Sequence, residues 1–184
     1  EEGRGEPVEL AEMTASGFRV VRVPPLLGRS FVEADELAGA PAMVVIGYAL
    51  WQSRFMGDPR VVGRTVRLGR EPVTVVGVMP EGFAFPISHS LWMPLRLSAL
   101  DVQRREGPQI GMFGRLAPGA TVREAQAELT TMGLRTAADF PDTHAQLRPE
   151  VMPYAASILN LSATESLGML AINLFLVMLL VLVA

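Results

Sequence analysis

The chain has 184 residues, a formal net charge of −3 and no cysteine. This length suits one compact domain or two small ones, the small charge does not indicate a nucleic-acid partner, and the missing cysteines exclude thiol catalysis, disulfides and cysteine metal sites. All 16 basic residues are arginine, so a Walker A phosphate loop and Schiff-base chemistry, which both need lysine, are excluded within this sequence.

The first part of the chain predicts a strand, a helix and an extended segment. Pro7–Met13 reads as a short strand, and Ala15–Val23 as a helix that stops at Pro24 and Pro25, because a residue before proline avoids the helical region. Leu26–Phe31 is expected to turn into an extended piece.

The middle of the chain predicts a strand–helix–hairpin order. Ala42–Ile46 reads as a buried strand and Gly47–Met56 as a helix, which the turn residues Gly57–Pro59 end. The strand-like runs Arg64–Leu68 and Pro72–Met79 are joined by a very short connection, and they predict a β-hairpin.

The later part predicts two more strands around a helix. Ile110–Leu116 reads as a strand, and Thr121 and Glu124 form a T-x-x-E capping box that predicts a helix running to about Asp139. Arg148–Met152 is expected to be the last strand. Because strands and helices alternate without a sustained βαβ repeat, the predicted fold class is α+β.

The end of the sequence predicts a membrane-spanning helix. Leu167–Ala184 carries no charge, and twelve of its 18 residues are Leu, Ile, Phe or Val, close to the roughly 20 apolar residues that a span requires. A buried core helix is the alternative. No arginine occurs between Arg148 and the end, which favours the outer side of the membrane for the N-terminal flank.

Several patterns invite a chemical interpretation, and each has a simpler one. A phosphate cradle at Gly63, Gly69, Gly77 and Gly82 needs a glycine loop before a helix, whereas these glycines flank or interrupt strands, so turns and bulges are favoured. The arginines between residues 54 and 70 alternate with valine rather than aromatic residues, which favours a solvated sheet face over a nucleic-acid surface.

The titratable residues predict neither catalysis nor a metal site. The acidic cluster Glu33, Asp35 and Glu36 lacks the spacing of a calcium loop, and a solvated loop is expected. His89 and His144 lie far apart in loop-like contexts, and no G-x-S-x-G elbow accompanies them. Trp51 and Trp92 are expected to be core anchors rather than ligand platforms. We therefore expect no catalytic residue, no metal and no cofactor.

Three strings occur in a fixed order: W-x-x-RF-x-GDP-x-x-x-G from Trp51, TVVGVMP-x-GF-x-FP from Thr74, and LW-x-PL from Leu91. With TASGFRVVRVPPLLGRSF upstream and RLAPGATVREAQAEL and FPDTHA downstream, they resemble the MacB-like periplasmic core domain of FtsX-like ABC transporter permeases, in the branch of large, duplicated, stand-alone permeases. One departure is near Gly17–Phe18, where many relatives carry an aromatic pair. The motif residues, for which a structural role is expected, are Trp51, Arg54, Phe55, Gly57, Asp58, Pro59, Gly63, Gly77, Pro80, Gly82, Phe83, Pro86 and Trp92.

The resemblance implies a two-lobed extracytoplasmic domain of mixed sheets and helices over residues 1–160, with an inserted lobe at about 42–100. It is followed by a truncated transmembrane helix at residues 165–184. Because residue 1 is Glu rather than Met, the sequence is expected to be a fragment or a processed piece.

The function that the resemblance implies is mechanical. The domain of a permease subunit couples ATP-driven conformational change to export or extraction of a substrate, and ATP hydrolysis is expected in a separate ATP-binding cassette subunit. The implied partners are the cell inner membrane, that ATPase, and a second permease unit, as a dimer or an internal duplicate, but no nucleic acid. The alternatives are a membrane-anchored extracytoplasmic binding or sensor module without transport activity, and a membrane-tethered hydrolase that uses His144.

Overall fold

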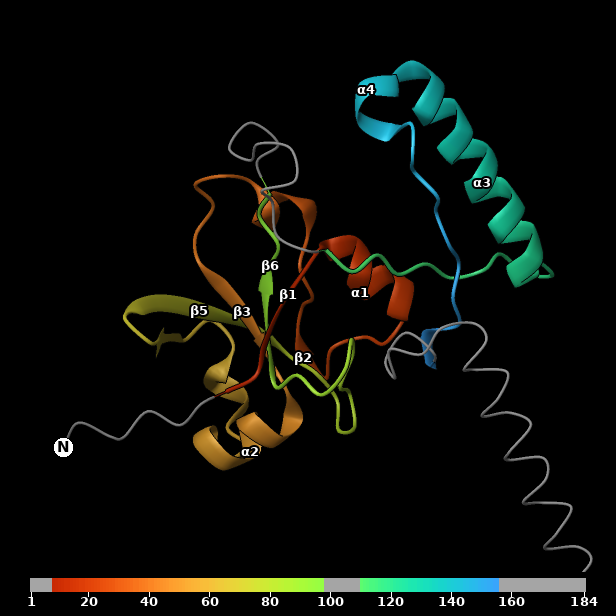
Figure 1. Ribbon diagram of the computed structural model, residues 1–184. Coiled ribbons are helices and arrows are strands. Elements are labelled where there is room, and N and C mark those ends of the chain that lie inside the picture. The colour runs from red at the N-terminus through yellow and green to blue at the C-terminus, as the bar shows by residue number, and fades with distance from the viewer. Residues whose placement is uncertain (1–7, 98–109, 156–184) are drawn as a thin grey trace, which may run out of the picture. The chain divides into compact units, whose positions relative to one another are not determined.

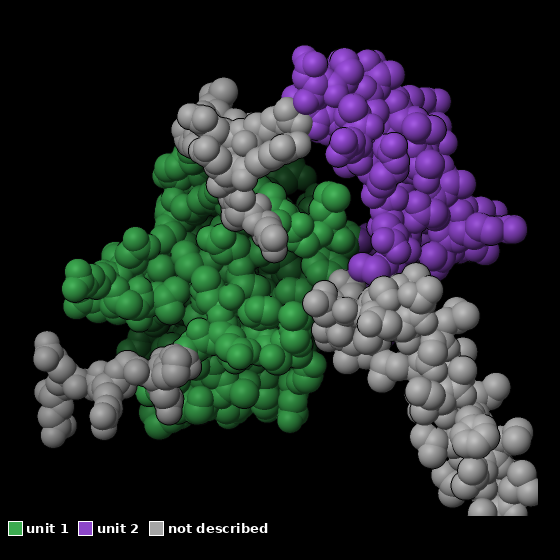
Figure 2. Space-filling view, viewed as in Figure 1, with its two compact units in different colours: residues 1–113 green, residues 114–184 purple. Residues whose placement is uncertain are grey.

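A computed structural model describes residues 8–97 and 110–155 of the chain. The chain divides into two compact units, residues 1–113 and residues 114–184 (Figure 2). Each unit is described here by itself.

The first unit is built on a six-stranded mixed sheet in the order β1-β6-β3-β5-β2, with β4 pairing β5 beside this path (Figure 1). Its strands are β1 (Leu10–Met13), β2 (Leu27–Gly28), β3 (Met43–Ile46), β4 (Thr65–Leu68), β5 (Glu71–Val78) and β6 (Leu91–Pro94). Its helices are α1 (Ala15–Val21) and α2 (Tyr48–Phe55), with the short 3₁₀ turns η1 (Glu33–Glu36) and η2 (Pro59–Val61).

The sheet is buried on both faces because its central strand β3 is apolar at every position. In β3, Val45 belongs to one hydrophobic cluster, with Phe18 of α1. Its neighbours Val44 and Ile46 belong to the other cluster, with Trp51 of α2. Since successive side chains of a strand point to opposite faces, the two clusters cover opposite faces of the sheet. A short, continuously apolar strand such as AMVVI is typical of this position.

The predicted hairpin is confirmed. Strands β4 and β5 pair antiparallel in the register Thr65↔Thr74 to Leu68↔Glu71, and Gly69 has a φ of 62° in the turn between them. A positive φ at that position favours glycine.

The remaining glycines of the stretch also have the backbone roles that were predicted. Gly63 and Gly82 have φ values of 85° and 77°. The register of β3 against β5 shifts, with Val44 facing Val75 and Val45 facing Gly77, so that Val76 is an extra residue in β5. The stretch therefore contains turns and a bulge, as expected from glycines at strand ends.

Helix α1 ends two residues earlier than predicted. Its N-cap is Thr14, whose side chain accepts a hydrogen bond from the backbone N–H of Gly17. At its other end Arg22 adopts a left-handed conformation with φ 60°, and its N–H donates to the carbonyl of Phe18. This cap stops the helix before the two prolines can.

The second unit contains α3 (Val122–Asp139) and the short helix α4 (Pro141–His144), of which α4 was not predicted. The capping box is confirmed: the N–H of Glu124 donates to Thr121 Oγ1 at 3.2 Å, and the N–H of Thr121 donates to Glu124 Oε2 at 2.7 Å. The bond from the N–H of Thr121 and a second from Thr121 Oγ1, at 2.8 Å, both reach the Glu124 carboxylate and hold its pKa below the usual value.

Two predicted strands are wrong. Residues 148–152 form no strand, because this segment runs back along α3 and uses the amide of Gln126 as its partner. Gln126 donates to the carbonyl of Pro149 at 2.9 Å and accepts from the N–H of Val151 at 2.7 Å. Residues 110–116 are also not a strand, since an alternating pattern makes a strand only where a neighbouring backbone supplies its hydrogen bonds.

Within residues 8–97 and 110–155, no helix has the length and apolar character that crossing a bilayer requires. The predicted membrane helix at residues 165–184 lies outside the described residues, and the proposed lobe boundaries, with an inserted lobe at about 42–100, stay a prediction.

Gly77 is a position where the fold has no room for a side chain. A Cβ atom there would lie 2.2 Å from the carbonyl oxygen of Arg29, which is backbone and cannot give way. We expect Gly77→Ala to lower the free energy of unfolding by about 2–3 kcal/mol, a typical overpacking cost. Thermal unfolding followed by circular dichroism measures this. Gly114→Ala is the control, because a Cβ there meets nothing within 4 Å; equal melting temperatures for the two variants would contradict the close approach.

Candidate functional site

The first motif string folds into the end of α2 and the turn η2. Trp51 donates its indole N–H to the carbonyl of Asp58 at 2.9 Å, and Asp58 is the N-cap of η2, with Oδ1 accepting from the N–H of Arg60 at 3.0 Å. Pro59 occupies the first turn of η2, where its missing N–H costs nothing. Gly57 lies between the two elements with a φ of 68°. These groups bond to one another rather than forming an open site.

The other members of that string have different degrees of burial. Phe55 is half-buried against the cluster beneath α2, and the N–H of Gly63 donates to the carbonyl of Val75 at 2.7 Å. Arg54, in the last turn of α2, is exposed. The string therefore connects α2 to β5 through its backbone and has two exposed arginines, Arg54 and Arg60.

The second string forms the end of β5 and the loop that follows. Gly77 pairs with Gly28 of β2, and the two backbones approach so closely that neither residue has room for a Cβ. Pro80 and Gly82 make the next turn, in which the N–H of Phe83 donates to the carbonyl of Pro80 at 3.2 Å.

The loop after this turn is anchored by the third string. Trp92 is fully buried and donates its indole N–H to the carbonyl of Phe85 at 2.7 Å. The peptide bond between Phe85 and Pro86 is cis. Trp51, at 9% exposure, and Trp92 are both core residues, which agrees with the sequence-based interpretation.

An aromatic cluster joins α1 to this loop. Phe18 lies 5.3 Å from Phe31 and 6.3 Å from Phe83 between ring centroids, and Phe83 lies 5.1 Å from Trp92. The edge-to-face and stacked geometries are those that aromatic pairs prefer. The four rings come from four segments, so the cluster holds together α1, the segment after β2, the motif loop and β6.

The acidic cluster is solvated only at Glu33, whose side chain is 81% exposed, and the prediction of a solvated loop is wrong for Asp35. Asp35 is 3% exposed, and its carboxylate accepts two hydrogen bonds from the guanidinium of Arg29, at 2.6 and 3.1 Å. It also accepts from the N–H of Val32 at 2.9 Å. A buried carboxylate requires such partners, because leaving the charge unpaired in a dry site is costly. The spacing of the acids gave no sign of this burial, since the partner Arg29 is fixed by β2.

The other two acids of the cluster bond to α1. Glu36 accepts from the N–H of Ala15 at 2.5 Å, at the start of that helix, where a negative charge is favourable. Glu33 pairs with Arg19 at 3.2 Å on the surface. Arg96, which follows β6, donates to the carbonyl of Asp35 at 3.0 Å and to that of Pro41 at 2.7 Å. The cluster thus acts as a polar strap that binds α1, β2 and the end of β6.

Neither histidine assembles a catalytic group among the described residues. His144 Nδ1 lies 2.5 Å from Thr143 Oγ1 on the exposed surface of the second unit. His89 is half-buried, and its Nδ1 has no hydrogen-bond partner. No group of three or more His, Asp or Glu side chains placed to hold a metal occurs in residues 8–97 and 110–155.

Comparison with known families identifies this arrangement. The family model of the MacB-like periplasmic core domain matches residues 2–132. The chain belongs to this family. The matched region contains the whole sheet of the first unit, both helices that cover it, and every residue of the three motif strings.

Part of the chain also resembles solved structures. One matching structure is the crystal structure of the extracellular domain of the noncanonic ABC-type transporter YknZ from Gram-positive bacteria, with 26% sequence identity and a TM-score of 0.39. The match covers 47% of this chain and 42% of that one, so this chain spans less than half of the solved protein. No curated protein matches the chain.

In this MacB-like domain, the ion pair between Arg29 and Asp35 holds the polar strap together, and acid should disrupt it. The hydrogen bonds from Arg29 hold the pKa of Asp35 below its usual value. A carboxyl with a lowered folded-state pKa stabilises the fold above its unfolded pKa of about 3.9, and this contribution is lost as the pH falls through the folded value. We therefore expect stability to fall below about pH 4, and Asp35→Asn to remove part of that pH dependence.

At neutral pH, Asp35→Asn should cost about 1–3 kcal/mol of unfolding free energy, since Arg29 loses a buried partner. Denaturant unfolding at pH 7 and at pH 3.5 measures both effects. Glu33→Gln is the matched control, because it breaks an ion pair whose side chains are 62% and 81% exposed and that contributes little. An Asp35→Asn variant that behaves like this control would show that the strap is not stabilising.

Proposed function

We propose that this MacB-like domain is the extracytoplasmic part of an ABC-type permease subunit, anchored in the cell inner membrane with residues 1–160 on the periplasmic side. It couples ATP binding and hydrolysis in a separate subunit to export or extraction of a substrate, and it is not itself an enzyme. The observation that carries the proposal is the family match over residues 2–132.

The internal contacts of the first unit support a mechanical role. Its motif residues are used for packing: Trp51 bonds to Asp58, Trp92 bonds to Phe85, and Gly77 admits the backbone of β2. A body that transmits movement between a membrane segment and a substrate must not deform under load, and a dense core with low compressibility meets this need. The same contacts leave the motif little to offer to a small ligand.

The proposed partners follow from the same role. An ABC-type permease needs a nucleotide-binding unit. We propose a separate ATPase for this role, and a second permease unit, as a dimer or an internal duplicate, to complete the transport pathway.

Co-purification tests this function. The complete open reading frame is expressed in its native membranes and purified through a tag, and the eluate is assayed for a bound ATPase and for ATP hydrolysis. We expect a stoichiometric ATPase whose activity is lost when its own Walker A lysine is replaced. An intact, folded permease that purifies without an ATPase would instead favour a membrane-anchored binding or sensor module.

A pair of variants tests whether the first unit transmits movement between the ATPase and the substrate. Trp92→Phe removes the hydrogen bond to Phe85 while keeping an aromatic ring, and we expect substrate-stimulated ATP hydrolysis to fall more than basal hydrolysis. Glu33→Gln, at an exposed position, is expected to change neither rate. Equal loss of basal and stimulated activity would indicate a folding defect rather than a loss of coupling.

A further inference from the structure

The guanidinium of Arg29 uses a sulfur atom as one of its hydrogen-bond acceptors. Each of its two terminal nitrogens carries two hydrogens. Nη1 donates to the carbonyl of Ser30 at 3.0 Å and to Asp35 Oδ2 at 2.6 Å, and Nη2 donates to Asp35 Oδ1 at 3.1 Å. The remaining contact joins Nη2 to Met43 Sδ at 3.4 Å. The guanidinium therefore bonds to oxygen everywhere except at the thioether of Met43.

This sulfur is a poor partner for a permanently charged donor. A thioether accepts hydrogen bonds weakly, whereas an oxygen acceptor forms a shorter and stronger bond with a guanidinium N–H because the donor is charged. The hydrogen that Nη2 directs to Met43 is a different one from the hydrogen that it directs to Asp35. An oxygen in the position of the sulfur would therefore strengthen one bond of Arg29 without displacing the other.

Met43 lies where solvent can reach its sulfur. It is the half-buried first residue of β3, whose other residues are fully buried. Its side chain packs against the hydrophobic cluster that contains Phe18, and its sulfur contacts Arg29, whose side chain is 44% exposed. Met13 and Met79, which belong to the same cluster, are buried. Met43 is thus the methionine of this cluster that combines partial exposure with a charged donor.

We propose that Met43 is an oxidation site, at which a peroxide converts the thioether to a sulfoxide and thereby tightens the polar strap. An electron pair of the sulfur attacks one peroxide oxygen, and the O–O bond breaks. The leaving hydroxide takes the proton of the transferred oxygen and becomes water, so the sulfur is oxidised and the peroxide is reduced. Methionine sulfoxide reductases reverse this step, one enzyme for each sulfoxide epimer.

The sulfoxide oxygen ties the strap to the central strand of the sheet. In the reduced protein the oxygen acceptors of Arg29 belong to Ser30 and Asp35, and the contact with β3 is the weak one to sulfur. The backbone near the start of β3 is already fixed, because Arg96 donates to the carbonyl of Pro41 at 2.7 Å. Only the flexible side chain of Met43 has to adjust to the added oxygen.

The sign of the effect on stability distinguishes this site from ordinary oxidative damage. A sulfoxide in a hydrophobic core normally destabilises the fold, because a polar group is buried without a partner. At Met43 the partner is present before oxidation, so the folded state gains a charge-assisted bond. If the new oxygen instead drew Arg29 away from Asp35, oxidation would loosen the strap and lower the stability.

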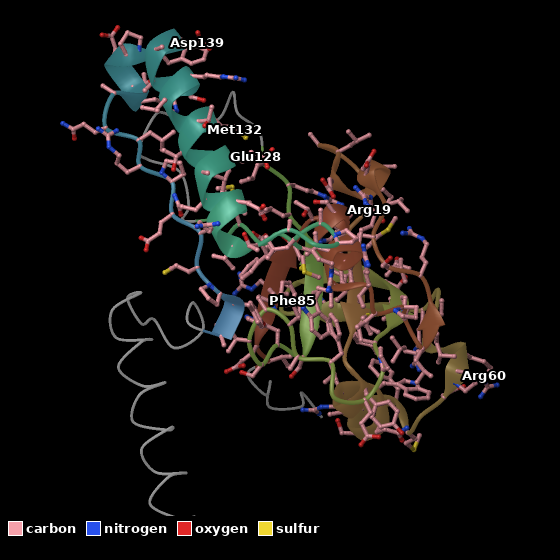
Figure 3. All side chains as sticks on the ribbon, turned by 90° about the vertical axis from the view of Figure 1, so that its right-hand side faces the viewer. Arg19, Arg60, Phe85, Glu128, Met132 and Asp139 are labelled. Atoms are coloured by element: carbon pink, nitrogen blue, oxygen red, sulfur yellow. The ribbon has the colours of Figure 1, made fainter. Side chains whose placement is uncertain are left out.

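Peroxide treatment of the full chain, purified in a mild detergent, tests the sign. Peptide mapping by mass spectrometry identifies the oxidised methionines. Tryptophan fluorescence follows thermal unfolding of the first unit, because Trp51 and Trp92 are the two tryptophans of the chain. A Met43→Leu chain treated in the same way is the matched control, since it keeps every other methionine, including the exposed Met132 on α3 (Figure 3).

We expect peroxide to oxidise Met43 in the folded chain before Met13 and Met79. Relative to the Met43→Leu chain, treatment should raise the melting temperature by on the order of 4 °C, the shift that one added hydrogen bond gives a domain of roughly 100 residues. A Met43 that stays reduced until the chain unfolds overturns the proposal. An equal or lower melting temperature than in the treated control also overturns it.

A second pair of variants tests the bond without an oxidant. Met43→Gln supplies an amide oxygen in place of the sulfoxide oxygen, and we expect it to melt at a higher temperature than Met43→Leu. Met93 in β6 is also half-buried, but it packs against the other cluster. There Met93→Gln should melt below Met93→Leu, because the amide is buried in apolar surroundings. The same order at both positions would overturn the role of Arg29. No step uses an ATPase, so the result is independent of the co-purification test.

Discussion

The close approach of β2 to the bulged part of β5 is the contact on which the rest of the first unit depends. Gly28 and Gly77 face each other there, and neither position has space for a Cβ atom. This approach places Arg29, the next residue of the chain, where its guanidinium meets the buried carboxylate of Asp35. Asp35 in turn fixes η1, and η1 carries Glu36 to the start of α1. A single backbone contact thus determines where a charged strap and a helix lie.

Burial of the sheet on both faces makes the first unit a densely packed body. The apolar strands β3 and β5 pack under α1 on one side and under α2 on the other, and indole hydrogen bonds fix the two turns that carry the family motifs. In the proposed mechanical function, force passes through these packed groups.

Local patterns predicted the elements whose signals lie within a few residues. The hairpin of β4 and β5, the capping box of α3 and the buried strand β3 all follow from turn glycines, side-chain caps or an apolar run, and the structure confirms them. Strand β6 was missed because LWMP is short and contains a proline. The segment at residues 148–152 was wrongly predicted to be a strand. Its hydrogen bonds are made with the side chain of Gln126, and no sequence pattern predicts such a partner.

The sequence by itself determined the α+β class, the turn chemistry of the glycine–proline stretch and the family to which the chain belongs. Each of these depends on patterns of residues that lie close together along the chain. Only the tertiary structure decided that Asp35 is buried against Arg29 rather than solvated, and that Met56 is exposed in a strained turn. The physical reason is the same in both cases. Burial and strain depend on which distant backbone fills the space around a residue, and that space is defined only when the sheet has formed.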